Sequence, residues 1–170
     1  MNLGFEVVEL PETEHVKEGD DAPDFTRPLV NDEYWEDTSL SELAEESEKV
    51  VLIFHPMDGA FPSTYIWNEV RDREWADEAT VVGISVSSPY EHKTFIEERG
   101  IDYWLFSDPQ NGVAEEYGIV NDLDGMAGIS EPRPATFLID EERRVQYAWV
   151  AQKWPDFPDY DEIEDELAGL

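Results

Sequence analysis

Two continuous apolar runs, separated by a segment with helical spacing, most strongly constrain how this chain can fold. They are residues 50–54 (VVLIF) and residues 79–86 (ATVVGISV). Short apolar runs rich in β-branched residues are typical of strands buried on both faces of a sheet. Between them, Ile66, Trp67 and Val70 recur at helical spacing. The pattern therefore predicts a sheet with helices packed against it.

The remaining segments continue this alternation of strand and helix patterns. Ser39 and Glu42 have the spacing of a capping box at the start of one helix, and Leu40 and Leu43 share its apolar face. In chain order, the pattern predicts an extended segment after the turn at 19–25, a helix from 38, helices at 64–75 and 89–100, a short strand at 103–106, a short helix at 111–117, strands at 135–139 and 144–150, and an amphipathic helix within 159–170. We expect one three-layer α/β domain over residues 1–170, with a mixed central sheet and a short acidic C-terminal helix at 159–170.

The surface charge is strongly unbalanced. Among 170 residues, 42 Asp and Glu face 11 Lys and Arg, which gives a formal net charge of −31, while 41% hydrophobic residues are enough for a core. Repulsion among the carboxylates fades in concentrated salt, because the Debye length falls from about 8 Å at physiological ionic strength to about 3 Å at 1 M. The composition resembles that of haloarchaeal proteins, so we expect a high-salt cytosol and hydrated cations around the carboxylates.

The composition also excludes several functions. The sequence has no basic stripe for nucleic acid or for an anionic membrane surface. It has neither an apolar run long enough to span a membrane nor a signal-peptide pattern, so we expect a cytoplasmic protein. The chain has no cysteine, which excludes disulfides, thiolate metal sites and a cysteine nucleophile. Because His15, His55 and His92 lie in unrelated segments without ligand spacing, we expect no metal and no cofactor.

From about residue 19 to residue 150 the chain resembles a peroxiredoxin of the alkyl hydroperoxide reductase and thiol-specific antioxidant family. The resemblance rests on GDDAPDF at 19–25, VVLIFHPMDGAFPST at 50–64, the stretch from VVGISVSSPYEH to VAEEYGI at 81–119, and PRPATFLIDEERRV at 132–145. The length is most similar to the small bacterioferritin-comigratory type. The resemblance implies a thioredoxin-like fold and the activity of an antioxidant, thiol-dependent peroxidase.

In that family a cysteine at a helix N-terminus attacks the peroxide and becomes sulfenic acid, assisted by a Thr or Ser three positions earlier and by an arginine. A second cysteine five positions later resolves the sulfenic acid in some members. Only the proline of the family's loop is unaltered in this sequence. The corresponding positions hold Pro56 (proline), Ala60 (Thr or Ser), Ser63 (peroxidatic cysteine), Asn68 (resolving cysteine) and Pro134 (arginine), with Arg133 one residue before the last.

These replacements predict that the chain is inactive as a thiol peroxidase, since a serine hydroxyl has no sulfenic state. We expect instead a non-catalytic scaffold that binds a partner, either a second copy of itself or an active peroxiredoxin. One alternative is a working antioxidant enzyme whose native residue 63 is cysteine, replaced by serine in the laboratory. Another is a protein that binds a small ligand in the former peroxide pocket, enlarged by Ala60.

Other residues of the loop and the following helix have simpler interpretations. Ser63 as a hydrolase nucleophile with His55 as its base would lack an orienting acid and an oxyanion loop, so we expect Ser63 or Thr64 to cap the helix. Met57, the redox sulfur nearest the old site, and Met126 are expected to fill space. For the aromatic residues that follow the loop we expect packing in the core or in a dimer interface: Tyr65, Trp67 and Trp75.

Overall fold

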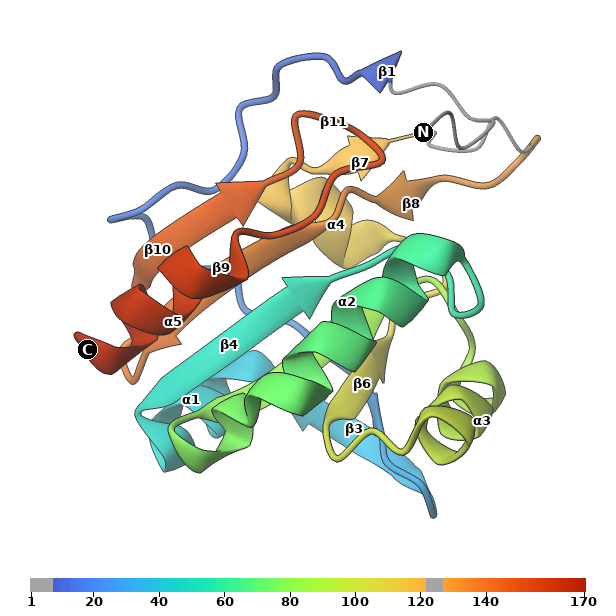
Figure 1. The fold of residues 1–170 in the computed structure, drawn as a ribbon, viewed down its shortest axis with the longest axis horizontal. Helices are drawn as coiled ribbons and strands as arrows, with labels where there is room; N and C mark the ends of the chain where they lie inside the picture. Colours follow the sequence, from blue (N-terminus) through green and yellow to red (C-terminus); the bar gives the residue numbers. More distant parts are fainter. Residues whose placement is uncertain (1–7, 122–126) are drawn as a thin grey trace.

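A seven-stranded mixed sheet forms the centre of the molecule (Figure 1). The computed structural model describes residues 8–121 and 127–170. Strands β4, β5 and β6 run parallel, and the others pair antiparallel. In spatial order the strands are β10 (Val145–Val150), β9 (Ala135–Asp140), β4 (Lys49–Phe54), β5 (Thr80–Ser85), β6 (Trp104–Ser107), β2 (Thr26–Val30) and β3 (Trp35–Ser39).

Helices cover both faces of this sheet, which confirms the expected three-layer α/β fold. One apolar core lies under α1 (Leu40–Ser47) and α4 (Gly112–Tyr117). The other lies under α2 (Phe61–Arg73), α3 (Pro89–Arg99) and α5 (Tyr160–Ala168). Figure 1 shows α2, α3 and α5 together in front of the sheet. None of the helices in the described ranges is long and apolar enough to cross a membrane.

Two short strand pairs lie outside the main sheet. The N-terminal strand β1 (Val8–Glu9) pairs with β11 (Lys153–Trp154), and β7 (Val120–Asn121) pairs with β8 (Glu131–Pro132). The first pair brings the N-terminal segment beside the connection between β10 and α5. The N-terminal segment therefore lies close to the residues just before β9, which include Arg133.

The main differences from the sequence prediction concern the hairpin of β2 and β3 and the bounds of α2. Strand β3 was not predicted, because its sequence WEDTS is polar and lies at the exposed edge of the sheet. Helix α2 begins at Phe61 rather than Thr64, since a proline such as Pro62 is tolerated in the first turn of a helix. The helix ends at Arg73, and Trp75 lies in a separate 3-10 turn, Trp75–Asp77.

The packing of α2 on the sheet depends on the glycine of β5. A β-carbon at Gly83 would overlap Trp67 Cζ2 and would lie 2.6 Å from Leu105 Cδ2. Trp67 is fully buried and comes from the second turn of α2. The helix can therefore approach the sheet this closely only because residue 83 has no side chain.

We expect Gly83→Ala to lower the free energy of unfolding by about 1–3 kcal/mol, because it overpacks a rigid aromatic contact. Chemical denaturation in concentrated KCl measures the change. Gly112→Ala is the matched control, since its β-carbon would lie 3.4 Å from the flexible end of Arg27. Equal stability of Gly83→Ala and the unaltered protein would contradict this account of the packing.

Candidate functional site

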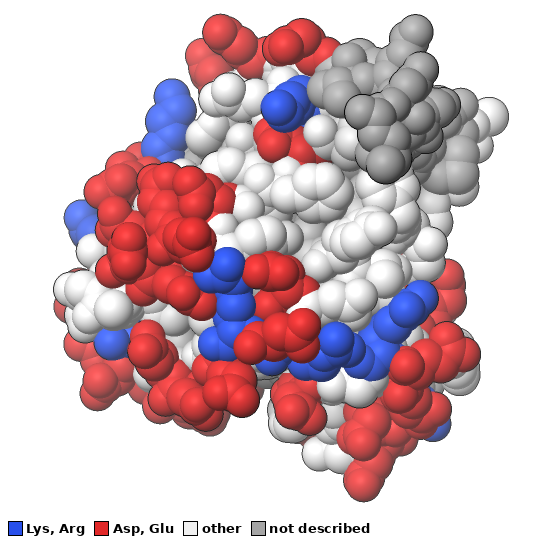
Figure 2. All heavy atoms as spheres, viewed as in Figure 1, with Lys and Arg blue, Asp and Glu red and all other residues white. Residues whose placement is uncertain are grey.

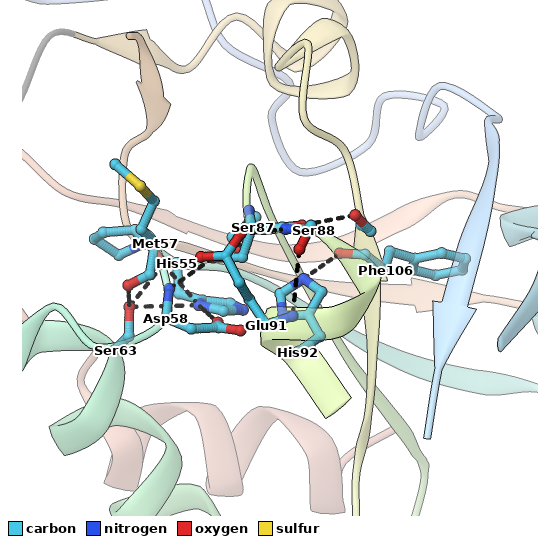
Figure 3. Close-up of polar contacts among 12 residues, drawn as sticks. His55, Met57, Asp58, Ser63, Ser87, Ser88, Glu91, His92 and Phe106 are labelled. Atoms are coloured by element: carbon cyan, nitrogen blue, oxygen red, sulfur yellow. Dashed lines mark hydrogen bonds and ion pairs between the residues drawn. The ribbon is translucent and has the colours of Figure 1, made fainter. Parts of the chain in front are cut away.

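The loop between β4 and α2 occupies the edge of the sheet where three parallel strands end. Strands β4, β5 and β6 all run parallel, so the loops that follow them meet at their carboxyl ends, the usual place for sites in α/β proteins. Gly59 has a φ of +89°, a left-handed conformation that glycine adopts without strain. Figure 3 shows the polar side chains that surround this loop.

Ser63 faces the interior of this loop. It is the third residue of α2, whose N-cap is Ala60, and no side chain caps the helix. The prediction that Ser63 or Thr64 caps the helix is therefore wrong. The Ser63 hydroxyl is fully buried and lies 2.7 Å from the carbonyl of Pro56 and 3.0 Å from the carbonyl of Met57. Its single proton is directed to these carbonyls, because a carbonyl oxygen can only accept.

His55 lies beside Ser63 but is not placed to act as its base. Its Nδ1 is 2.9 Å from the carbonyl of Pro56, so Nδ1 carries the proton and donates it there. Ser63 Oγ is 3.4 Å from the same nitrogen. Burial lowers the pKa of His55 to about 4, against smaller opposing effects of Asp58 and the Pro56 carbonyl. The imidazole is neutral at pH 7, and its unprotonated nitrogen, Nε2, makes no hydrogen bond within the described residues, to Ser63 or to any other group.

Asp58 joins the loop to helix α3 through His92. Asp58 Oδ2 lies 2.6 Å from His92 Nδ1, and His92 Nε2 lies 2.9 Å from the carbonyl of Phe106. The ring centroids of His55 and His92 are 5.9 Å apart. The two histidines, which the sequence placed in unrelated segments, thus lie in one buried cluster with Asp58. Within the described ranges, no group of three or more His, Asp or Glu side chains is arranged to hold a metal ion.

Arg133 is directed away from this cluster. Its guanidinium donates to the carbonyl of Pro11 at 2.6 Å and to that of Ala151 at 3.3 Å, and it is almost fully buried. Burial lowers the pKa of Arg133 below its ordinary value. Successive residues of an extended chain face opposite sides, and Ala135 faces the core under α1 and α4. Residue 134, which faces the α2 side, is a proline. The cation is one residue earlier, at Arg133, and therefore lies on the opposite side of the sheet.

The remaining positions singled out from the sequence lie along the same loop and helix. Met57 is half-buried, and its backbone N–H donates to Glu131 Oε2 at 2.8 Å. Met57 also lines a cavity of about 430 Å³, to which neither Ala60 nor Ser63 contributes. Asn68 is half-buried on α2. Met126 lies outside the described residues.

The aromatic residues after the loop divide into two sets. Trp67 and Trp75 are buried in the core under α2, α3 and α5, which agrees with the packing expected for them. Tyr65 is exposed and makes edge-to-face contacts with Phe61 and Phe157. This exposed set lies at the first turns of α2, next to the loop that carries Ser63.

This fold and this loop define the class of peroxiredoxin-like α/β proteins, and comparison with known proteins specifies the family. Residues 18–148 match the profile of the AhpC/TSA family. The putative peroxiredoxin sll0755 of Synechocystis sp. is 34% identical, over 81% of this chain and 70% of that protein. The putative peroxiredoxin bcp of Coxiella burnetii is 33% identical, over 81% of this chain and 91% of that protein. The chain therefore belongs to the AhpC/TSA family.

Solved structures agree with this assignment. The crystal structure of peroxidoxin BcpB from Mycobacterium tuberculosis superposes with a TM-score of 0.73 at 30% identity, covering 91% of this chain and 96% of that one. AhpC of Enterococcus faecalis superposes with a TM-score of 0.75 at 18% identity, covering 89% of this chain and 90% of that one, a likeness of fold alone. The predicted thioredoxin-like, peroxiredoxin-type fold is thus confirmed.

Three residues that sequence reasoning did not assign to the site contribute to it: Asp58, His92 and Glu131. Each comes from a different segment, so no local spacing connects them. The one available signal was the position of Asp58 and His92, just after two predicted buried strands. Parallel neighbours among such strands bring the residues that follow them together.

The pKa of His55 predicts an acid-dependent loss of stability. The unfolded chain binds a proton at His55 below pH 6.5, whereas the folded chain binds it only below about pH 4. The free energy of unfolding should therefore fall, as the pH decreases from 6.5 to 4, by about 3 kcal/mol from this group. We expect the stability difference between the unaltered protein and His55→Gln to shrink by that order over this range.

Denaturation at fixed salt and stepped pH measures this difference and cancels the titration of the many surface carboxylates. His15→Gln, outside the cluster, is the control for removal of a histidine. A difference for His55→Gln that stays constant between pH 6.5 and pH 4 would show that His55 is protonated in the folded protein.

Proposed function

We propose that this protein is a non-peroxidatic member of its family that acts as a scaffold or binding partner. The observation that carries the proposal is Ser63, a buried hydroxyl bonded to the carbonyls of Pro56 and Met57 where the family has its nucleophile. The chain contains no cysteine that could replace it. Without a thiol the protein has no sulfenic acid and no disulfide to reduce, so the family's redox cycle has no starting point.

The surroundings of residue 63 also disfavour an anion. Two carbonyl oxygens face the Ser63 hydroxyl, and the carboxylate of Asp58 lies within the same cluster. Arg133 donates its hydrogen bonds to other carbonyls. A helix N-terminus alone stabilises a negative charge by at most about 2 kcal/mol. A thiolate at this position would thus lack the cation that lowers the pKa of reactive cysteines.

We expect the unaltered protein, supplied with a thiol reductant in concentrated salt, to consume no hydrogen peroxide above background. Ser63→Cys alone should remain at least about tenfold slower than a variant that also carries Ala60→Thr, Arg133→Pro and Pro134→Arg, because only the latter restores the cation on the α2 side. Initial rates of peroxide consumption, with each fold verified by circular dichroism, measure this.

The same assay separates the alternatives. Turnover by the unaltered protein would contradict the proposal. Full activity of Ser63→Cys alone would favour a working peroxidase whose native residue 63 is cysteine. A small ligand in the cavity of about 430 Å³ next to Met57 would contact neither Ala60 nor Ser63.

An exposed aromatic patch, formed by Phe61, Tyr65 and Phe157, is the surface best suited to a partner. These residues are 42%, 62% and 38% exposed, respectively. The Tyr65 ring contacts the rings of both Phe61 and Phe157 edge to face. Figure 2 shows an area without charged side chains over the beginning of α2, on a face otherwise rich in carboxylates. Aromatic residues are enriched, and acidic residues depleted, in protein interfaces. Because the net charge of −31 disfavours contact between the acidic surfaces of two copies, self-association through this uncharged patch is favoured.

We expect the protein to form a dimer in concentrated KCl and Tyr65→Glu to be monomeric, because a carboxylate in the centre of the patch would be buried without a partner. Sedimentation velocity measures both. Tyr90→Glu is the matched control, since Tyr90 is an exposed aromatic residue on α3 outside the patch. A monomeric starting protein, or a dimer that survives Tyr65→Glu, would contradict this use of the patch.

We also propose that the protein works in a high-salt cytosol, without nucleic-acid or membrane partners. The formal net charge of −31 supports this. Concentrated cations screen the repulsion between carboxylates and make both folding and self-association of such a chain favourable. Hydrated cations around the acidic faces are the expected small partners.

A further inference from the structure

We propose that the buried Asp58–His92 contact is a lock that holds the loop between β4 and α2, and with it the aromatic patch, in one conformation. This inference rests on the proposed role of the patch in partner binding, and it names what controls that surface. Asp58 belongs to the loop and His92 to α3, and their side chains meet 2.6 Å apart with almost no solvent exposure. Figure 3 shows the two side chains pointing toward one another across the interior.

The hydrogen-bond partners of His92 fix where its protons are. The carbonyl of Phe106 can only accept, so Nε2 of His92 carries a proton and donates it. Asp58 Oδ2 and His92 Nδ1 are both acceptors when unprotonated, and a separation of 2.6 Å requires a proton between them. The pair is therefore a short hydrogen bond in the interior, where such bonds are stronger than in water.

Asp58 is also held through its main chain. Its backbone N–H donates to Ser87 Oγ at 2.9 Å, and Ser87 in turn accepts at its carbonyl from Ser107 Oγ at 2.6 Å. The loop is thus connected through Asp58 to the segment that follows β5 and, through Ser87, to the last residue of β6. These contacts add to the hydrogen bonds within the loop, which connect Ser63 and His55 to the carbonyl of Pro56.

The lock connects directly to the aromatic patch. Asp58 lies three residues before Phe61, and the only intervening residues are Gly59 and Ala60. If the Asp58–His92 bond is lost, the buried carboxylate has no partner and the loop must move to hydrate it. That movement changes the first two turns of α2, which present Phe61 and Tyr65. A partner that requires the patch would then bind the locked form alone.

Two measurements test the lock independently of any partner. In the unaltered monomeric or dimeric protein labelled with ¹⁵N-histidine, we expect a strongly downfield proton on Nδ1 of His92 that is protected from exchange. Its absence would overturn the proposal without the need for any variant. In native-state amide exchange, we expect Asp58→Ala and His92→Phe each to raise the exchange rate of the amides of residues 57–61 and 63 at least about tenfold, while amides of β4 and β5 stay protected.

A matched set of variants separates a lock from a general loss of stability. The double variant should open the loop no more than the worse single variant, because both remove one contact. Glu91→Gln, at the exposed cap of α3, is the control and should leave the loop unchanged. Asp58→Asn, which preserves shape, replaces Asp58→Ala if the latter does not fold. Additive effects, or an unchanged loop in the single variants, would overturn the lock.

The partner surface is tested separately by sedimentation. If the downfield proton and the exchange pattern are as expected but the protein remains monomeric, the lock stands and the proposed self-association fails. If the protein forms a dimer through Tyr65 and the loop opens freely in the unaltered chain, the lock fails and the partner surface stands.

Discussion

The close approach of α2 to strand β5 is the constraint on which the site depends. Trp67 lies over Gly83, where a side chain would overlap its ring, and this contact sets the direction of the helix. Ser63 is four residues before Trp67, so the two share one face of α2 and both point inward. The Trp67 ring also packs edge-to-face on the His55 ring, with their centroids 5.6 Å apart. The inward position of residue 63 is therefore a consequence of core packing rather than of local capping.

Around the start of α2, the polar side chains form internal hydrogen bonds and do not form a site that stabilises an anion. The Ser63 hydroxyl, the Asp58 carboxylate and the two histidines bond to one another or to main-chain carbonyls. Arg133, the cation nearest in sequence to the family's arginine, is held by carbonyls on the other side of the sheet. The chain thus has the fold of its family, and the proposal that it is not a peroxidase depends on these hydrogen bonds around Ser63.

Sequence patterns gave most of the elements, because the buried strands have apolar runs that few other structures accept. The first element that the patterns missed is β3, a polar strand at the edge of the sheet. Its residues have no apolar pattern, and its pairing with β2 stabilises it as a strand. The second was the start of α2, where Pro62 reads as a break but fits the first turn. The capping role of Ser63 failed for the same reason, since a start three residues earlier moves Ser63 inside the helix.

The sequence by itself determined the family resemblance, the missing thiol and the acidic surface, because each is a property of residue types at fixed positions along the chain. Only the tertiary structure decided that Asp58 and His92 meet, since parallel strands bring together loops that are far apart in sequence. It also decided that Arg133 faces away from Ser63. A shift of one residue along an extended chain reverses the side on which a side chain lies, and only the pairing of the strands shows what occupies each side.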